Sequence, residues 1–253
     1  MNPELPNLFL AGVQKGGTTA LAQFLGSHPE IGLAAGKEAH VLDRADIGQW
    51  SAGRIAKRYA RHFEGCGEVR YRLDATPIYC YYPPALEAIA RVQPQARLIV
   101  LLRDPVERAV SHYRMEFGRG NERRGALAAF ALEPWRLWRE AQSGTVLGPA
   151  RRVASYVDRG RYRRQLQQLL NHFPPEQVLV LRSEALRRHH QAVLNQVFDW
   201  LGLARQTVPA QTVFAGQRGP KVGKIARALL RARLWREQGW LARAYPVNRP
   251  DQP

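Results

Sequence analysis

The residue types best suited to chemistry stand together near the start of the chain, as Lys15-Gly16-Gly17-Thr18-Thr19. Residues 8–13 before them are apolar and predict a buried strand, while residues 20–25 carry leucines and a phenylalanine at helical spacing. The glycines therefore fall in a strand-to-helix turn, where free N–H groups and the positive helix end favour an anion. Lys15 adds a full positive charge, so this segment predicts a phosphate-binding loop.

The order of residues in this loop differs from the Walker A motif of nucleoside triphosphatases. That motif ends in Gly-Lys-Ser/Thr, whereas here Lys15 precedes the glycine pair. The chain also lacks a clear Walker B aspartate at the end of a strand. A P-loop nucleotide kinase or NTPase is therefore an alternative interpretation that fits the lysine poorly.

A second candidate anion site follows residues 97–102 (RLIVLL), which predict another buried strand. Arg103 stands at its carboxyl end, where open α/β sheets bind ligands. The Asp-Pro pair that follows is typical of a helix start, and that helix places Arg108 and Ser111 on one face. An arginine and a serine hydroxyl suit a phosphate group; alternatively, they are occupied by a neighbouring carboxylate and by their own helix.

The alternation of elements along the 253 residues predicts an α/β protein, a P-loop-like three-layer fold with a central parallel sheet flanked by helices. Besides the two strands above, we expect strands at residues 31–33, 70–73 and 178–181, and helices at residues 83–92, 134–142, 161–172 and 191–201. We assign residues 1–216 to this domain and residues 217–253 to a basic, helical C-terminal segment.

The net charge of +17 comes almost entirely from arginine. It reflects either a compositional bias or an acidic ligand such as a nucleotide, a polyanionic glycan or nucleic acid. A polyanion-binding protein without catalysis is therefore a second alternative, and it predicts salt-dependent binding. No apolar run is long enough to span a membrane, and Cys66 and Cys80 lack metal-ligand spacing. We expect a cytoplasmic protein with reduced cysteines, without a transmembrane segment and without a metal.

The C-terminal segment places Ile225, Leu229, Ala232 and Trp235 on one face of a helix that is rich in arginine. Such a helix either lies on an anionic membrane or polymer, or packs against the domain with its basic face in solvent. The sequence leaves both possibilities open, including a peripheral contact through this segment.

Two anion sites on neighbouring strand ends imply a ligand with two separated phosphates. The segments FLAGVQKGGTTAL, SHPEI, KEAHVLD and RLIVLLRDPVERAVSHY, in this order, resemble the sulfotransferases that use 3′-phosphoadenosine-5′-phosphosulfate (PAPS). The resemblance covers about residues 8–203 and is closest to bacterial and glycan (heparan-sulfate-type) enzymes. It implies sulfuryl transfer to a hydroxyl or amine of a carbohydrate or other small acceptor, with adenosine 3′,5′-bisphosphate as product and no nucleic-acid partner.

The resemblance also implies which residues bind the donor. Lys15, Gly16, Gly17, Thr18 and Thr19 match the loop that holds the 5′-phosphosulfate, with Lys15 facing the bond that breaks. Arg103 and Ser111 match the pair that binds the 3′-phosphate. The later block Gly160-Arg161-Tyr162 is similar to one near the cofactor, which adds Tyr162 to this group.

On the acceptor side, Glu38 matches the acidic residue that acts as base in the glycan enzymes, and His40 is the second choice for that role. His40 and Asp43 match residues that line the acceptor. In the block RLDATPIYCYY, this chain has Ala75 where the glycan enzymes commonly have lysine.

Overall fold

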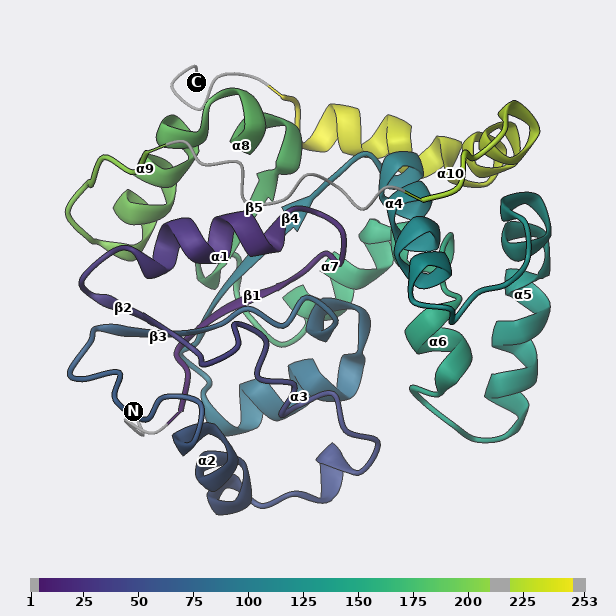
Figure 1. Cartoon of the computed structure of the whole chain (residues 1–253). Coiled ribbons are helices and arrows are strands. Elements are labelled where there is room, and N and C mark those ends of the chain that lie inside the picture. The colour runs from purple at the N-terminus through teal and green to yellow at the C-terminus, as the bar shows by residue number, and fades with distance from the viewer. Residues whose placement is uncertain (1–4, 210–218, 248–253) are drawn as a thin grey trace.

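A five-stranded parallel sheet forms the centre of the computed structural model, which describes residues 5–209 and 219–247 (Figure 1). The strand order is β2-β3-β1-β4-β5. The strands are β1 (Leu8–Gly12), β2 (Ile31–Leu33), β3 (Tyr71–Asp74), β4 (Arg97–Leu102) and β5 (Val178–Arg182). The predicted parallel sheet is confirmed, and each strand lies within one residue of the bounds that we expected for it.

The sheet is apolar on both faces, because helices cover both. Phe9 and Leu10 of β1 point to opposite sides, as successive residues of a strand must, and both are buried. Phe9 belongs to the core beneath α2 (Ala52–Ala60), α3 (Pro83–Val92) and α7 (Tyr162–Leu170). Leu10 belongs to the core beneath α1 (Thr18–Gly26), α8 (Ser183–Arg188) and α9 (His190–Leu201). The predicted three-layer α/β fold is therefore confirmed.

A third core lies beside the sheet, on the right of Figure 1. It is built by α4 (Pro105–Gly118), α5 (Ala126–Gln142) and α10 (Lys224–Ala244), with α6 (Pro149–Val153) nearby. Short 3₁₀ turns complete the fold: η1 (Ile47–Gln49), η2 (Tyr79–Tyr81), η3 (Asp158–Gly160) and η4 (Pro175–Gln177).

Helix α5 corrects one sequence-based boundary. We expected a helix from residue 134, but α5 begins at Ala126 and Pro134 lies in its interior. Pro134 has no N–H to bond the carbonyl of Phe130, one turn earlier. That carbonyl instead accepts a hydrogen bond from Nη1 of Arg233 in α10, at 2.8 Å. A side chain distant in sequence thus satisfies the group that the proline leaves unpaired.

Helix α10 packs through a face other than the one the sequence singled out. Its buried residues are Ala226, Leu230, Leu234, Glu237 and Leu241. The face with Ile225 and Trp235 points outward, and these side chains are 73% and 63% exposed. The predicted boundary between residues 216 and 217 lies outside the described residues. Across the described ranges, no helix is long and apolar enough to cross a membrane.

The turn after β1 lies tightly against the end of β4. The Val13 N–H donates to the carbonyl of Leu101 at 3.2 Å, and the Gly16 N–H donates to the carbonyl of Val13 at 2.8 Å. A Cβ atom on Gly16 would lie 2.4 Å from the Leu101 carbonyl oxygen and 2.8 Å from that of Val13. Only glycine fits this position, so the close approach of two strand ends depends on it.

We expect Gly16→Ala to lower the free energy of unfolding by about 1–3 kcal/mol, because the backbone must shift to admit the methyl group. Gly53 in α2 is the matched control, since a Cβ there meets no atom within 4 Å. Gly53→Ala should be neutral or stabilising by up to about 1 kcal/mol. Urea unfolding of both variants measures this, and equal effects would contradict the close contact at Gly16.

Candidate active site

The predicted phosphate-binding loop joins β1 to the N-terminus of α1. Gly17 precedes the helix with a φ of 99°, in the left-handed region, and no side chain caps this end. The N–H groups of the first turn thus stay available to an anion. Thr18 is buried and Thr19 is half-buried behind them.

The Lys15 ammonium has a weak partner in the described structure. Its Nζ lies 3.6 Å from Sδ of Met115 in α4, and a thioether is a poor hydrogen-bond acceptor. Burial lowers the pKa of Lys15, and the nearby guanidinium groups of Arg119 and Arg103 lower it further. A buried ammonium beside other cations favours binding of an anion, because an anion relieves both the burial and the repulsion.

Arg103 brings the second predicted anion site to the same place. Its Nη1 donates to the main-chain oxygen of Lys15 at 3.1 Å, so the ends of β1 and β4 are joined directly. Its Nε is buried without a hydrogen-bond partner among the described residues. Tyr162 is fully buried, and its hydroxyl donates to the Arg103 carbonyl at 2.9 Å. Tyr162 therefore holds the main chain of Arg103 in place. Ser111, two turns along α4, is half-buried.

For Arg108, the sequence left open whether the side chain is a phosphate ligand or is occupied within the protein. Its side chain is fully buried, and Nη2 donates to the carbonyl of Tyr156. Nε and Nη1 of Arg108 and both ring nitrogens of His112 lack hydrogen-bond partners within the described ranges, although Nε2 of His112 lies 3.8 Å from Oε1 of Glu116. Burial holds the pKa of His112 well below its usual value, so the ring is neutral. The buried Arg108 guanidinium adds positive charge close to Lys15 and Arg103, which favours binding of an anion at the loop.

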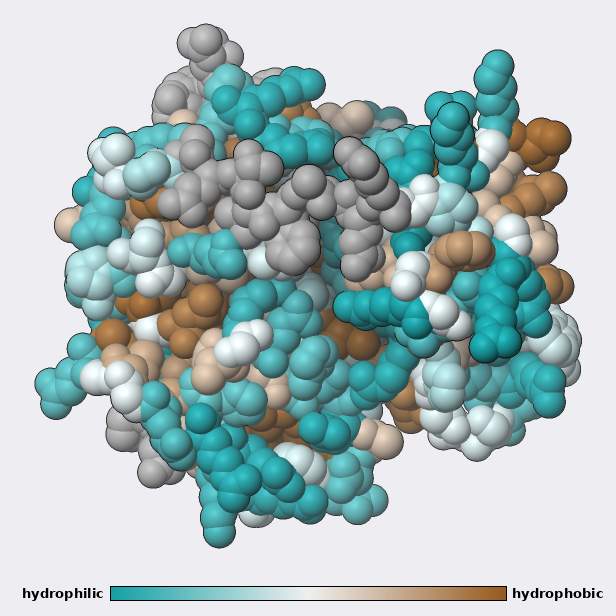
Figure 2. All heavy atoms as spheres, viewed as in Figure 1, coloured by the Kyte–Doolittle hydropathy of each residue, from teal (hydrophilic) through white to brown (hydrophobic). Residues whose placement is uncertain are grey.

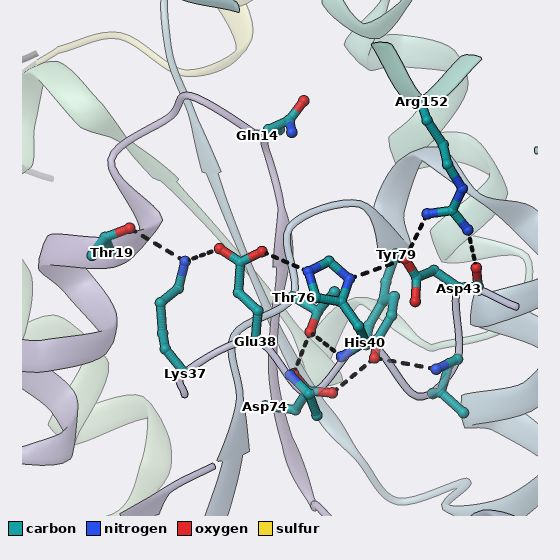
Figure 3. Close-up of polar contacts among 12 residues, drawn as sticks. Gln14, Thr19, Lys37, Glu38, His40, Asp43, Asp74, Thr76, Tyr79 and Arg152 are labelled. Atoms are coloured by element: carbon teal, nitrogen blue, oxygen red, sulfur yellow. Dashed lines mark hydrogen bonds and ion pairs between the residues drawn. The ribbon is translucent and has the colours of Figure 1, made fainter. Parts of the chain in front are cut away.

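A second group of charges begins at the loop and leads away from it (Figure 3). Nζ of Lys37 donates to Oγ1 of Thr19 at 3.2 Å and also contacts Oε1 of Glu38. The Lys37 ammonium therefore lies between the phosphate-binding loop and the Glu38 carboxylate. The sequence motif contained Lys37, but we had assigned no role to it.

The row of charges continues through His40 to Asp43. Oε2 of Glu38 lies 3.1 Å from Nε2 of His40, and Nδ1 of His40 lies 3.0 Å from Oδ2 of Asp43. Nη1 of Arg152, in α6, donates to the same Asp43 oxygen at 2.9 Å. Cationic and anionic groups thus alternate from Lys37 to Arg152, and the structure brings together the three acceptor-side residues that we predicted (Figure 3).

These contacts fix the charge states of the row. Hydrogen bonds to Asp43 and Glu38 raise the pKa of His40 to about 9. Burial raises the pKa of Asp43, but hydrogen bonds from His40 and Arg152 outweigh it and bring the value to about 2. The pKa of Glu38 is likewise lowered, because His40 and Lys37 outweigh the effect of burial. At neutral pH, both carboxyl groups are ionised and His40 is an imidazolium.

A buried carboxylate at the end of β3 positions the segment that carries Glu38 and His40. Oδ2 of Asp74 accepts hydrogen bonds from Tyr59 and Tyr79, both at 2.9 Å. Its Oδ1 accepts from Thr76 at 2.6 Å and from the Ala39 N–H at 3.3 Å. This network fixes the segment beside the sheet edge.

Arg159 in η3 joins the phosphate-binding loop to α6. This guanidinium is buried, and its Nη1 donates to Oε1 of Gln14, the residue before Lys15. Its Nη2 donates to the carbonyls of Arg151 at 2.8 Å and Arg152 at 3.1 Å. Since Arg152 contacts Asp43, Arg159 also links the phosphate-binding loop to the row of charges from Lys37 to Arg152.

Four further residues of the site were not predicted from the sequence: Lys37, Asp74, Arg152 and Arg159. A signal existed for two of them, because Lys37 adjoins Glu38 and Asp74 ends a predicted strand. Arg152 stands 109 positions after Asp43, among many other arginines, and nothing local distinguishes it.

Ala75 is fully buried, and its N–H donates to the Lys37 carbonyl at 3.2 Å. Among the described residues, no cluster of His, Cys, Asp and Glu could hold a metal ion.

Known proteins resemble the chain in sequence. The sulfotransferase domain family matches residues 5–226. Heparan sulfate glucosamine 3-O-sulfotransferase 6 of Mus musculus is 31% identical over 216 residues, which are 85% of this chain and 57% of that protein. The 3-O-sulfotransferase 3B1 of Homo sapiens is 31% identical over 80% of this chain and 47% of its own length. The chain thus spans about half the length of these relatives.

Solved structures of sulfotransferases are similar to this chain in fold. A sulfotransferase from Alicyclobacillus acidocaldarius is 25% identical, has a TM-score of 0.76 and is matched over 95% of both chains. The sulfotransferase domain of the Synechococcus PCC 7002 olefin synthase shares the fold at 18% identity and a TM-score of 0.55. A matching family profile, relatives above 30% identity and a shared fold all coincide with the two motifs and with the site built from them. The chain therefore belongs to the sulfotransferase family.

Proposed function

We propose that this chain transfers a sulfuryl group from PAPS to a hydroxyl or amine of a carbohydrate or other small acceptor, with Glu38 as the base. The observation that carries the proposal is the direct link between the cationic loop and a carboxylate, through Lys37. When bound, the donor supplies a sulfuryl group activated by its attachment to a phosphate. The heparan sulfate relatives support a carbohydrate acceptor.

At the donor end, the N–H groups of residues 17–19 and the Lys15 ammonium hold the 5′ group. Lys15 would stabilise the negative charge that develops on the departing phosphate oxygen. Arg103 and Ser111 hold the 3′-phosphate, and Tyr162 keeps Arg103 in place through its main chain.

At the acceptor end, the charge states favour Glu38 over His40 as the base. His40, with a pKa of about 9, already carries its second proton at neutral pH and has no free lone pair. Glu38 is ionised and can accept the proton of the acceptor hydroxyl. A carboxylate with a lowered pKa is a weak base, but a loose transition state needs proton removal only late in the transfer.

Lys37 supplies a second ammonium close to the reacting groups. Its main chain adjoins Ala75, the position at which glycan sulfotransferases commonly have lysine. We infer that Lys37 aligns Glu38 with the phosphate-binding loop and adds positive charge there.

The cytoplasmic location and the bacterial source that we predicted remain part of this proposal. The likeness to an Alicyclobacillus enzyme supports the bacterial source.

The first test concerns the base. Glu38→Gln should lower kcat by about 10²–10⁴-fold, because the amide cannot accept the proton. Transfer from labelled PAPS to a panel of polysaccharide and small hydroxylated acceptors, read by mass spectrometry, measures this. Adenosine 3′,5′-bisphosphate should bind the variant as it binds the wild type. Glu64→Gln, at an exposed carboxylate, is the control. Wild-type transfer by the Glu38 variant would remove Glu38 from this role.

The second test separates the two phosphate sites. Arg103→Ala should weaken binding of adenosine 3′,5′-bisphosphate by roughly 10–100-fold, because a charge-assisted hydrogen bond is lost. Binding of adenosine 5′-phosphate, which lacks the 3′ group, should change little. Calorimetric titration of both nucleotides measures the difference, with Arg188→Ala at an exposed position of α8 as the control. An equal loss for both nucleotides would show that Arg103 acts only through the Lys15 carbonyl.

The third test concerns the protonated imidazole. The pKa of His40 is raised from 6.5 to about 9 in the folded protein, so its stabilising contribution is complete below pH 6.5. That contribution is lost as the pH rises towards 9. The wild type should therefore lose more stability over this interval than His40→Gln, by urea unfolding at matched ionic strength. Parallel pH profiles of the two proteins would contradict an imidazolium at this position.

A further inference from the structure

Exposed large hydrophobic side chains concentrate on two neighbouring helices, away from the catalytic residues. Four lie on α5 and two on α10, and together we name them the α5–α10 surface: Leu127, Leu132, Trp135, Trp138, Ile225 and Trp235. Their side chains are between 39% and 73% exposed. Figure 2 shows hydrophobic residues along the right-hand rim of the molecule, where these two helices lie in Figure 1. Soluble domains rarely expose such a concentration without a binding role.

Helix α5 is apolar on both of its faces. Its inner face packs Ala129 and Phe130 into the third core. The exposed positions between residues 127 and 138 are also apolar: Leu127, Ala128, Ala131, Leu132, Pro134, Trp135 and Trp138. An ordinary surface helix is polar on the side away from its core. The outer face of α5 therefore has the apolar composition that is typical of a surface in contact with another apolar environment.

Helix α10 lies beside α5 and extends this surface. Arg233 of α10 bonds the Phe130 carbonyl of α5, and Leu230 packs with Phe130 in the shared core. The outward side chains of α10 include Ile225, which is 73% exposed, and Trp235. Ile225 and Trp235 belong to the face that the sequence singled out, although Leu229 of that face packs partly against the third core.

The exposed charged side chains that α5 and α10 themselves contribute are all positive. The only carboxylates of the two helices are Glu133, Glu140 and Glu237, and all three are buried. The guanidinium of Arg139 lies 5.5 Å from the ring centre of Trp135, and that of Arg236 lies 5.3 Å from the ring centre of Trp235. Arg231 is also exposed on α10. The exposed surface of α5 and α10 is thus apolar and cationic, without an accessible acidic side chain.

We propose that the α5–α10 surface docks the protein onto an anionic lipid bilayer. Tryptophan and aliphatic side chains enter the boundary between headgroups and acyl chains, and the neighbouring arginines contact anionic headgroups. A second copy of the chain is a poor occupant, because both surfaces are cationic and each chain carries a net charge of +17. A soluble polyanion would use the arginines but would gain nothing from Leu127, Leu132 or Ile225.

The test is sedimentation of the full chain with vesicles of phosphatidylcholine, with and without phosphatidylglycerol. Leu127 and Leu170 are matched, since both are 45% exposed and Leu170 lies on α7. Leu127→Gln should lower the partition onto anionic vesicles by about tenfold, because the transfer of a leucine side chain is lost. Leu170→Gln should partition as the wild type does. Trp135→Gln should repeat the effect of Leu127→Gln.

The charge requirement is tested separately. Arg231→Gln should lower the partition onto anionic vesicles by roughly fivefold and leave the weak binding to neutral vesicles unchanged. Arg188→Gln on α8 is its control. Binding of adenosine 3′,5′-bisphosphate should be the same in all variants, so a failure here is distinct from a failure of the proposed chemistry.

Three outcomes would overturn the proposal. The first is wild-type protein that stays in the supernatant with anionic vesicles. The second is an equal loss of partition in the Leu127 and Leu170 variants. The third is self-association of the wild type, seen by light scattering, that the Leu127 and Trp135 variants lose, which would assign the surface to a second copy. Each variant is first compared with the wild type by urea unfolding, so that the partition refers to folded protein.

Discussion

The rest of the site depends on one interaction, the contact of the Lys37 ammonium with both Thr19 and Glu38. In the proposed reaction, the Glu38 carboxylate lies close to a cationic loop and must nevertheless leave that loop free for the donor. Lys37 contacts Thr19 at the loop and Glu38 on the other side, while His40 occupies the second Glu38 oxygen. Glu38 is thereby held between two cations, in contact with neither Lys15 nor Arg103 in any described hydrogen bond.

This arrangement imposes a backbone that residues other than glycine rarely adopt. Lys37 and His40 have φ angles of 71° and 51°, in the left-handed region. Such conformations persist only where the surroundings determine them by several contacts. Here Asp74 accepts four hydrogen bonds, including one from the Ala39 N–H between those two residues. The buried carboxylate of β3 therefore holds the geometry of the segment that carries Glu38 and His40.

Local patterns predicted much of the fold and several of the residues that the structure brings together at the candidate site. The turn at Gly16 could be read from the sequence because an apolar run, a glycine pair and a helical pattern stand within a few residues of one another. Asp43 and Arg152 show the limit, because their ion pair joins segments 109 positions apart and the chain offers many equivalent arginines. The two faces of α10 show another limit. Both Ile225 and Leu230 belong to plausible apolar stripes, and only the surface of α4 and α5 decides which stripe is buried.

The central claim is that the chain moves a sulfuryl group from PAPS to an acceptor. The most direct measurement incubates the purified protein with isotopically labelled PAPS and a polysaccharide panel, and follows both products by mass spectrometry. Our account predicts a labelled, sulfated acceptor and one adenosine 3′,5′-bisphosphate for each group transferred. It would be contradicted by a protein that leaves PAPS and the acceptors unchanged, fails to bind the bisphosphate, and instead hydrolyses ATP in the presence of magnesium.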